Sequence, residues 1–197
     1  MYLQITTKCN MRCEHCCFNC EPGKGEHMSR EVWELGIELC KDYDSKVAIG
    51  GGEPTLHPEF NDILLEAIAA SGEYTRPFIV TNGTNKKRAL LLHKLHKAEI
   101  VEAHLSTDQY HEYDMVDHEV REAFGHDDWD CGRQPINVGR WAESQEIETS
   151  GCACPDQLIQ TDGQIRYCGC LDAPIIGDVW NGITEEYECG CFKDHDL

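Results

Sequence analysis

Strand-like and helix-like segments alternate through the first half of the chain, and this alternation constrains the fold more than any other feature. The segments typical of short β-strands are 2–7, 46–49, 77–81 and 100–106. The segments with helical periodicity are 29–43, which Ser29 can cap, 58–71, whose first turn suits Pro58, and the basic, leucine-rich 86–97. Such alternation predicts a parallel α/β sheet, open or curved into a barrel. After residue 107 the pattern weakens, and we expect only a helix at 119–124 and a strand at 134–141.

Three cysteines follow the first predicted strand in one loop. Cys9, Cys13 and Cys16 lie in KCNMRCEHC, a C-x3-C-x2-C spacing. Three thiolates from one loop can bind three irons of a [4Fe–4S] cluster and leave the fourth iron open to another ligand. A zinc site would need a fourth protein ligand, which Cys17, Cys20 or His15 could supply. The spacing favours the iron–sulfur cluster, with zinc as the alternative.

The composition limits the class of protein. The 197 residues carry 17 Lys and Arg against 36 Asp and Glu, a formal net charge of −19, so we expect about one domain and no direct docking on nucleic acid. No apolar run approaches the roughly 18–20 residues of a membrane helix, and no signal-peptide pattern opens the chain. We therefore expect no membrane partner and a cytoplasmic location. Thirteen cysteines in such a chain indicate metal or iron–sulfur ligation rather than disulfides.

Three further motifs stand at the ends of the predicted strands. They are Gly51-Gly52-Glu53-Pro54, Thr81-Asn82-Gly83 and LSTDQYHE at 105–112. Together with the cysteine loop, these motifs resemble the radical S-adenosylmethionine (radical SAM) superfamily over residues 1–115. The resemblance implies an α/β fold, a shortened partial (β/α) barrel, because only about four β/α units precede residue 110 where the family has six.

The resemblance also implies a cofactor site. Family members bind S-adenosylmethionine (SAM) on the open iron of a [4Fe–4S] cluster, cleave it reductively to a 5′-deoxyadenosyl radical and abstract hydrogen from a substrate. Here it implies that Cys9, Cys13 and Cys16 bind the catalytic cluster and that Glu53 accepts a hydrogen bond from the SAM ammonium group. The implied SAM-binding residues are His15, Gly51, Gly52, Glu53, Pro54, Thr81, Asn82, Ser106 and Asp108. Each motif alone is also typical of a turn or a helix cap. His111, His118 and His126 could reach the open face of the site.

Six more cysteines form three Cys-x-Cys pairs near the C-terminus. The pairs are Cys152/Cys154, Cys168/Cys170 and Cys189/Cys191. Their spacing, and a hairpin-like segment at 158–168 with its turn at Asp162-Gly163, resemble the SPASM or shorter twitch auxiliary segment. The resemblance implies a second [4Fe–4S] cluster, bound by Cys152, Cys168 and two of the other four cysteines, with structural zinc as the alternative. We therefore expect a radical SAM core at 1–140 and a Cys-rich auxiliary segment at 141–197.

The leading hypothesis is a radical SAM enzyme, an oxidoreductase that modifies a peptide or peptide-derived substrate, because relatives with auxiliary clusters commonly act on such peptides. It would need an electron donor such as flavodoxin or ferredoxin. Since the chain opens at its first strand, a separate protein would have to recognise the substrate. The alternatives are radical modification of a nucleobase or small metabolite, an activase that forms a glycyl radical on a partner, and a non-catalytic iron–sulfur or zinc module. An activase does not explain the C-terminal cysteines, and a non-catalytic module does not need the GGEP and TNG motifs.

Overall fold

The computed structural model describes residues 1–72, 75–108, 110–125, 139–144, 156–169 and 173–186. The strands are β1 (Tyr2–Thr6), β2 (Ala48–Gly51), β3 (Phe78–Thr81), β4 (Glu102–Leu105), β5 (Leu158–Ile159), β6 (Gln164–Arg166), β7 (Ile175–Asp178) and β8 (Gly182–Ile183). The α-helices are α1 (Arg30–Asp42), α2 (Phe60–Ala70), α3 (Lys86–Lys97), α4 (His118–Phe124) and α5 (Gly139–Ser144), and the 3-10 helices are η1 (Pro54–Leu56) and η2 (Tyr113–Met115). Within the described ranges, no helix has the length and apolar character that crossing a bilayer requires.

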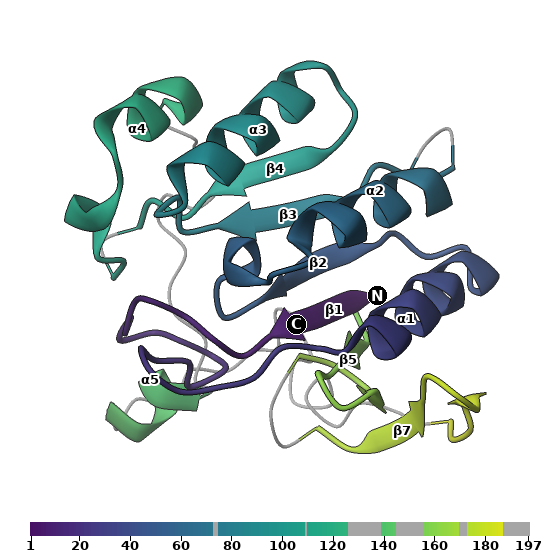
Figure 1. Cartoon of the computed structure of the whole chain (residues 1–197). Helices are drawn as coiled ribbons and strands as arrows, with labels where there is room; N and C mark the ends of the chain where they lie inside the picture. The colour runs from purple at the N-terminus through teal and green to yellow at the C-terminus, as the bar shows by residue number, and fades with distance from the viewer. Residues whose placement is uncertain (73–74, 109, 126–138, 145–155, 170–172, 187–197) are drawn as a thin grey trace, which may run out of the picture.

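One open sheet contains all the described strands, in the order β4-β3-β2-β1-β5-β6-β7-β8. The pairs from β4 to β5 are parallel, and the pairs from β5 to β8 are antiparallel. This arrangement confirms the predicted α/β class, with an open, mixed sheet that is parallel from β4 to β5. Figure 1 shows the strands side by side across the molecule.

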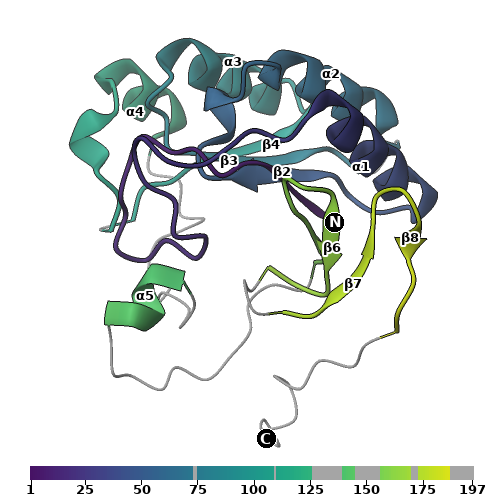
Figure 2. The same cartoon turned by 60° about the horizontal axis from the view of Figure 1, so that its bottom comes forward.

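A row of buried apolar residues crosses the four long parallel strands. Leu3 pairs with Ile49, Ile49 pairs with Ile79, and Ile79 pairs with Ala103. Each is at most 1% exposed, and all four belong to one buried cluster with residues of α1 and α2. Figure 2 shows α1 to α4 together on one face of the sheet. The burial of apolar side chains between this face and the helices stabilises the sheet.

Local signals set the ends of two helices. The Ser29 hydroxyl accepts a hydrogen bond from the Val32 N–H and caps α1, as predicted. Asn85 caps α3 in the same way through the Arg88 N–H, and the bounds of α3 match the predicted 86–97. Pro58 does not begin α2, contrary to the prediction. Pro58 lies two residues before the helix, which begins at Phe60 with Glu59 as its N-cap.

The C-terminal strands lie at the edge of the sheet opposite to β4. β5 pairs with β1, with Tyr2 opposite Leu158 and Leu3 opposite Ile159. The predicted hairpin is confirmed: β5 and β6 are antiparallel around Gly163, whose φ is +88°. Ile159, Ile165, Ile176 and Val179 belong to the same buried cluster as Leu3. The strands β5 to β8 therefore share the core of the α/β sheet.

The strand predicted at 134–141 is wrong in its described part, because Gly139–Ser144 is the helix α5. Residues 134–138 lie outside the described residues. Gly139 has a φ of +57°, a left-handed conformation that does not continue a β-strand. The alternation of apolar residues at 134–141 does not indicate the left-handed conformation of Gly139. The predicted division at residue 140 stays a prediction.

Candidate active site

A cavity of about 200 Å³ lies where β1, β2, β3 and β4 end. Because the strands are parallel, the loops that follow them meet at one edge of the sheet. The predicted site residues that line the cavity are Cys9, Cys13, His15, Cys16, Gly51, Gly52, Glu53, Pro54, Asn82 and Ser106. Thr81 and Asp108 do not line it. Thr81 instead binds Glu53, and Asp108 binds His15 and His111.

Five cysteines of the loop after β1 line this cavity, because Cys17 and Cys20 join the predicted triad. All five cysteines belong to the described residues. No three of their sulfur atoms lie within 4.8 Å of one another. Thiolates around a single zinc at about 2.3 Å would be about 3.8 Å apart. The wider spacing and the all-thiol donor set fit the predicted [4Fe–4S] cluster better than zinc.

The thiols of the triad differ in their surroundings. A hydrogen bond from the Cys20 thiol and backbone N–H donors lower the pKa of Cys16 to about 6. Burial raises the pKa of Cys13 to about 12 and also raises the pKa of Cys9. The Cys16 sulfur accepts a hydrogen bond from the Cys20 N–H at 3.3 Å, and the Cys9 sulfur accepts one from the Met11 N–H at 3.4 Å. Backbone donors to a ligand sulfur favour its thiolate form, which is the form that binds metal.

Glu53 joins the ends of β2 and β3. Its side chain is 1% exposed, and its Oε1 accepts hydrogen bonds from the Thr55 N–H at 3.0 Å and the Thr81 hydroxyl at 2.7 Å. The Thr55 hydroxyl also donates to Oε1, and Oε2 accepts from the Asn82 N–H at 2.7 Å. Burial raises the pKa of Glu53, against the effect of these donors. The carboxylate expected to face the SAM ammonium group is thus already bound to four protein donors.

The glycines of the GGEP motif lie against the chain that leaves β1. The Gly52 N–H donates to the Thr6 carbonyl at 2.8 Å, and the Glu53 N–H donates to the Lys8 carbonyl at 2.9 Å. A Cβ at Gly51 would lie 2.1 Å from the Thr6 oxygen, and one at Gly52 would lie 2.2 Å from the Lys8 oxygen. The close approach of the backbone at Thr6 and Lys8 therefore requires glycine at both positions, with or without a bound ligand.

Asn82 connects the third strand to the cysteine loop. Its side-chain amide donates to the Asn10 side chain at 3.0 Å and to the Cys9 sulfur at 3.9 Å. Its oxygen accepts from the Thr84 N–H and hydroxyl at 3.1 and 2.7 Å. Ser106, 9% exposed, follows β4 and also lines the cavity. These two residues therefore present polar side chains to any molecule bound there.

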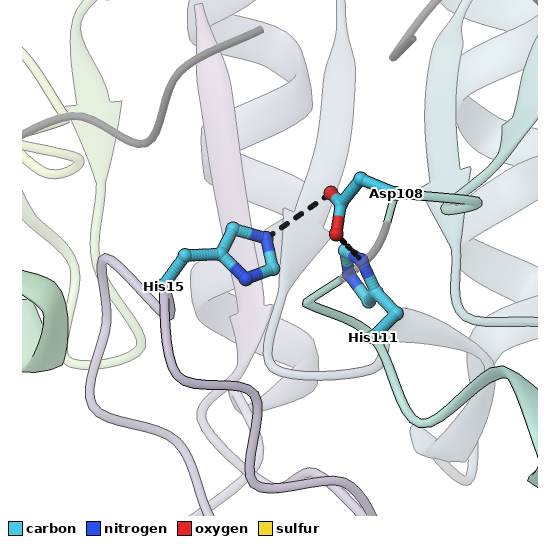
Figure 3. A group of neighbouring side chains, drawn as sticks. All are labelled: His15, Asp108 and His111. Atoms are coloured by element: carbon cyan, nitrogen blue, oxygen red, sulfur yellow. Dashed lines mark hydrogen bonds and ion pairs between the residues drawn. The ribbon is translucent and has the colours of Figure 1, made fainter. Parts of the chain in front are cut away.

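The side chains of His15 and His111, which line the cavity, both point toward the carboxylate of Asp108 (Figure 3). The Asp108 carboxylate lies 2.8 Å from His111 Nδ1 through one oxygen and 3.4 Å from His15 Nε2 through the other. Burial opposes ionisation of Asp108, but the hydrogen bond and charge of His111 and the charge of His15 lower its pKa to about 2. Burial lowers the pKa of His15, whose Nδ1 is buried without a hydrogen-bond partner in the described structure.

Of the three histidines predicted to reach the site, His111 lines the cavity, whereas His118 is 69% exposed at the start of α4. His126 lies outside the described residues. Tyr2 also lines the cavity and accepts a hydrogen bond from the Gly51 N–H at 2.6 Å through its hydroxyl. Sequence reasoning missed Tyr2, because a short strand pattern does not indicate which face turns toward a site.

The proposed second metal site is largely outside the described residues. Cys152, Cys154, Cys170, Cys189 and Cys191 fall there, and of the six C-terminal cysteines Cys168 alone is described. Cys168 is 5% exposed and follows β6. Cys40, on α1, is fully buried in the core.

A family model described as the Radical SAM superfamily matches residues 3–131. The chain belongs to the radical SAM superfamily. The matched segment contains the cysteine loop and the GGEP, TNG and LSTD motifs, and it ends before the C-terminal cysteines.

This radical SAM chain is similar in sequence to three curated proteins with different names. The putative peptide biosynthesis protein YydG of Bacillus subtilis (strain 168) is 28% identical over 115 residues, covering 55% of this chain and 35% of that protein. Human molybdenum cofactor biosynthesis protein 1 is 30% identical over 114 residues, covering 54% and 17%. An S-adenosylmethionine-dependent nucleotide dehydratase of a Thermoplasmatales archaeon (strain ISO4-H5) is 35% identical over 83 residues, covering 42% and 28%. The chain thus spans about a third or less of each relative.

A solved structure, the crystal structure of BtrN in complex with AdoMet and 2-DOIA, resembles this fold. Its TM-score is 0.56 at 16% sequence identity, covering 91% of this chain and 77% of that one. At this identity the likeness shows a common fold alone. At 91% of this chain, the likeness extends past residue 131.

Proposed function

We propose that this chain is a radical SAM enzyme that binds a [4Fe–4S] cluster through Cys9, Cys13 and Cys16 and cleaves SAM reductively. The observation that carries the proposal is the single cavity in which the three thiols meet the GGEP backbone, Asn82 and Ser106. A non-catalytic module would require no such meeting of thiols with polar groups from three other loops. A zinc module is further disfavoured by the spacing of the sulfur atoms.

A [4Fe–4S] cluster and SAM bound in this cavity would supply radical chemistry, the abstraction of hydrogen from a substrate. The chain's own residues bind and orient. The three cysteines hold the cluster, and Asn82 and Ser106 hydrogen-bond the polar groups of SAM. Glu53 keeps Asn82 in place by accepting a hydrogen bond from the Asn82 backbone N–H. The SAM ammonium group replaces the hydroxyl of Thr55 or Thr81 as a donor to Glu53. Asp108 fixes the ring of His111, which lines the cavity.

We propose a peptide or peptide-derived substrate. The name of YydG, a putative peptide biosynthesis protein, supports this class. A nucleotide or another small metabolite is the second candidate, supported by the names of the nucleotide dehydratase and of the molybdenum cofactor protein. A glycyl-radical activase has no comparable support. The net charge of −19 argues against DNA or RNA as a docking partner.

We also propose an electron donor, a partner protein and a second metal site. A low-potential donor such as flavodoxin or ferredoxin delivers the electron, and a separate protein presents the peptide. Cys152, Cys168 and two of Cys154, Cys170, Cys189 and Cys191 bind a second [4Fe–4S] cluster, with zinc as the alternative. The core then extends over 1–140 and the auxiliary segment over 141–197, in the cytoplasm.

The substrate class can be tested with anaerobically reconstituted, reduced protein. A true substrate increases 5′-deoxyadenosine formation and transfers deuterium from a labelled C–H bond to that product. A short peptide encoded beside the gene should do both, whereas nucleoside triphosphates should leave the basal rate unchanged. Deuterium transfer from a nucleotide, with none from the peptide, would replace the first candidate by the second.

A further inference from the structure

Helix α5 packs against the cysteine loop, although more than a hundred residues separate them in sequence. Both cartoon views show α5 beside the loop that follows β1 (Figures 1 and 2). The contact is made by Gly139 and Arg140. Neither residue belongs to a motif, and the sequence assigned the segment to a strand.

Arg140 binds three backbone carbonyls of the loop. Its backbone N–H donates to the Cys16 carbonyl at 3.0 Å. Its guanidinium donates to the Cys13 carbonyl at 2.5 Å through Nη1 and to the Cys20 carbonyl at 2.7 Å through Nη2. A planar guanidinium with several fixed donors suits such a bridge, whereas the single ammonium group of a lysine does not reproduce it.

Gly139 lets this contact form. Its φ is +57°, and a Cβ there would lie 2.5 Å from the carbonyl oxygens of both Cys16 and Cys17. The backbones of α5 and the loop therefore touch directly, and the guanidinium lies next to the loop instead of reaching it from a distance.

The bridge ends at the residue that binds the sulfur of Cys16. The Cys20 N–H donates to the Cys16 sulfur at 3.3 Å, and the Cys20 side chain is 4% exposed. Arg140 holds the carbonyl of this same Cys20. Arg12, in contrast, is 62% exposed on the outside of the loop, where it forms an ion pair with Glu21.

We propose that Arg140 is a positioning residue of the cluster site, which holds Cys20 against the Cys16 ligand and makes the bound cluster easier to reduce. This inference rests on the proposed function, because it requires a cluster at Cys9, Cys13 and Cys16. Reduction adds negative charge to the cluster. A nearby guanidinium and an N–H donor on a ligand sulfur both stabilise the reduced form, and outer contacts of this kind also retain the metal.

The test compares three reconstituted full-length variants, Arg140→Met, Arg140→Lys and the matched control Arg12→Met. The readouts are the midpoint potential of the cluster whose EPR signal changes when SAM is added, and the rate of iron loss to a chelator. Arg140→Met should have a more negative potential and lose iron about tenfold faster, the factor expected from a lost charge-assisted hydrogen bond. Arg140→Lys should keep a potential close to wild type yet lose iron faster, and Arg12→Met should match wild type in both.

Three results would overturn the inference. Equal potentials and equal iron loss in Arg140→Met and Arg12→Met would remove Arg140 from the site while leaving the proposed function intact. If Arg140→Met takes up no cluster, Arg140→Lys decides: iron loss at the wild-type rate would contradict the positioning role. A wild-type chain that takes up no SAM-responsive cluster would overturn both the inference and the proposed function.

Discussion

Glu53 is a buried carboxylate that joins several parts of the site. The Thr55 N–H binds Oε1 and the Asn82 N–H binds Oε2, so both oxygens are needed as acceptors. A backbone N–H cannot reverse its polarity, whereas the hydroxyls of Thr55 and Thr81 can rotate. The positions of β2, β3 and Asn82 therefore depend on a carboxylate at residue 53.

Glu53→Gln should destabilise the protein, because whichever way the amide turns, its NH₂ group faces one of these two backbone donors. The expected loss is about 1–3 kcal/mol in the free energy of unfolding, the cost of a buried unsatisfied group. Chemical unfolding measures it, and the SAM dissociation constant should rise as Asn82 shifts. Glu38→Gln, on a side chain 62% exposed, is the control. Equal stability of the two variants would refute the bridging role of Glu53.

At the level of single residues, the sequence predicted what motifs encode and missed what distant segments bring together. The cysteine triad, GGEP, Asn82 and Ser106 follow successive strands, and parallel strands bring such residues to one edge. Arg140 reaches the same site from a segment with no motif. Asp108 was predicted to bind SAM, yet its carboxylate oxygens lie against two histidines. Hydrogen bonds between side chains of different loops cannot be read from spacing.

At the level of elements, α5 depends on a glycine that no local pattern explains. Gly139 adopts a positive φ and lies against the carbonyls of Cys16 and Cys17. The N-terminal end of α5 thus packs directly against the backbone of the cysteine loop. Helix α3 is the opposite case, because Asn85 and a regular basic sequence define its bounds within the segment itself. The sequence predicted α3 correctly and α5 wrongly for this reason.

Gly139→Ala should separate α5 from the loop, because a Cβ cannot lie 2.5 Å from two backbone oxygens. The reconstituted variant should lose iron to a chelator faster than wild type. The matched control is Gly125→Ala, which imposes a similar positive φ, +67°, at a position where a Cβ meets nothing within 4 Å. If both variants lose iron at the same rate, backbone strain alone explains the effect and the α5 contact does not support the loop.

At the level of the whole molecule, the chain returns to its first strand after residue 155. β5 extends the sheet beside β1 and not beside β4, and β5 to β8 add apolar residues to the common core. Apolar packing therefore stabilises β5 to β8 as part of the common core. The sequence predicted the hairpin of β5 and β6, but it did not predict that β5 pairs with β1.

Cys152→Ala combined with Cys168→Ala should reduce iron from about eight to about four per chain, the difference of one cubane. The remaining cluster should still respond to SAM, since its cysteines lie in a different loop. Cys17→Ala is the control with one thiol removed and no predicted ligand lost. Zinc in place of the additional iron, or unchanged iron in the double variant, would contradict a second iron–sulfur cluster.

The central claim is that Cys9, Cys13 and Cys16 bind the cluster that cleaves SAM, and the most direct measurement is 5′-deoxyadenosine release. Anaerobically reconstituted protein with SAM and a strong reductant should form this product. Cys13→Ala should abolish it, whereas Cys17→Ala, which alters the same cavity without removing a predicted ligand, should retain it. No 5′-deoxyadenosine from wild-type protein with its full iron content, or undiminished release from Cys13→Ala, would contradict the account.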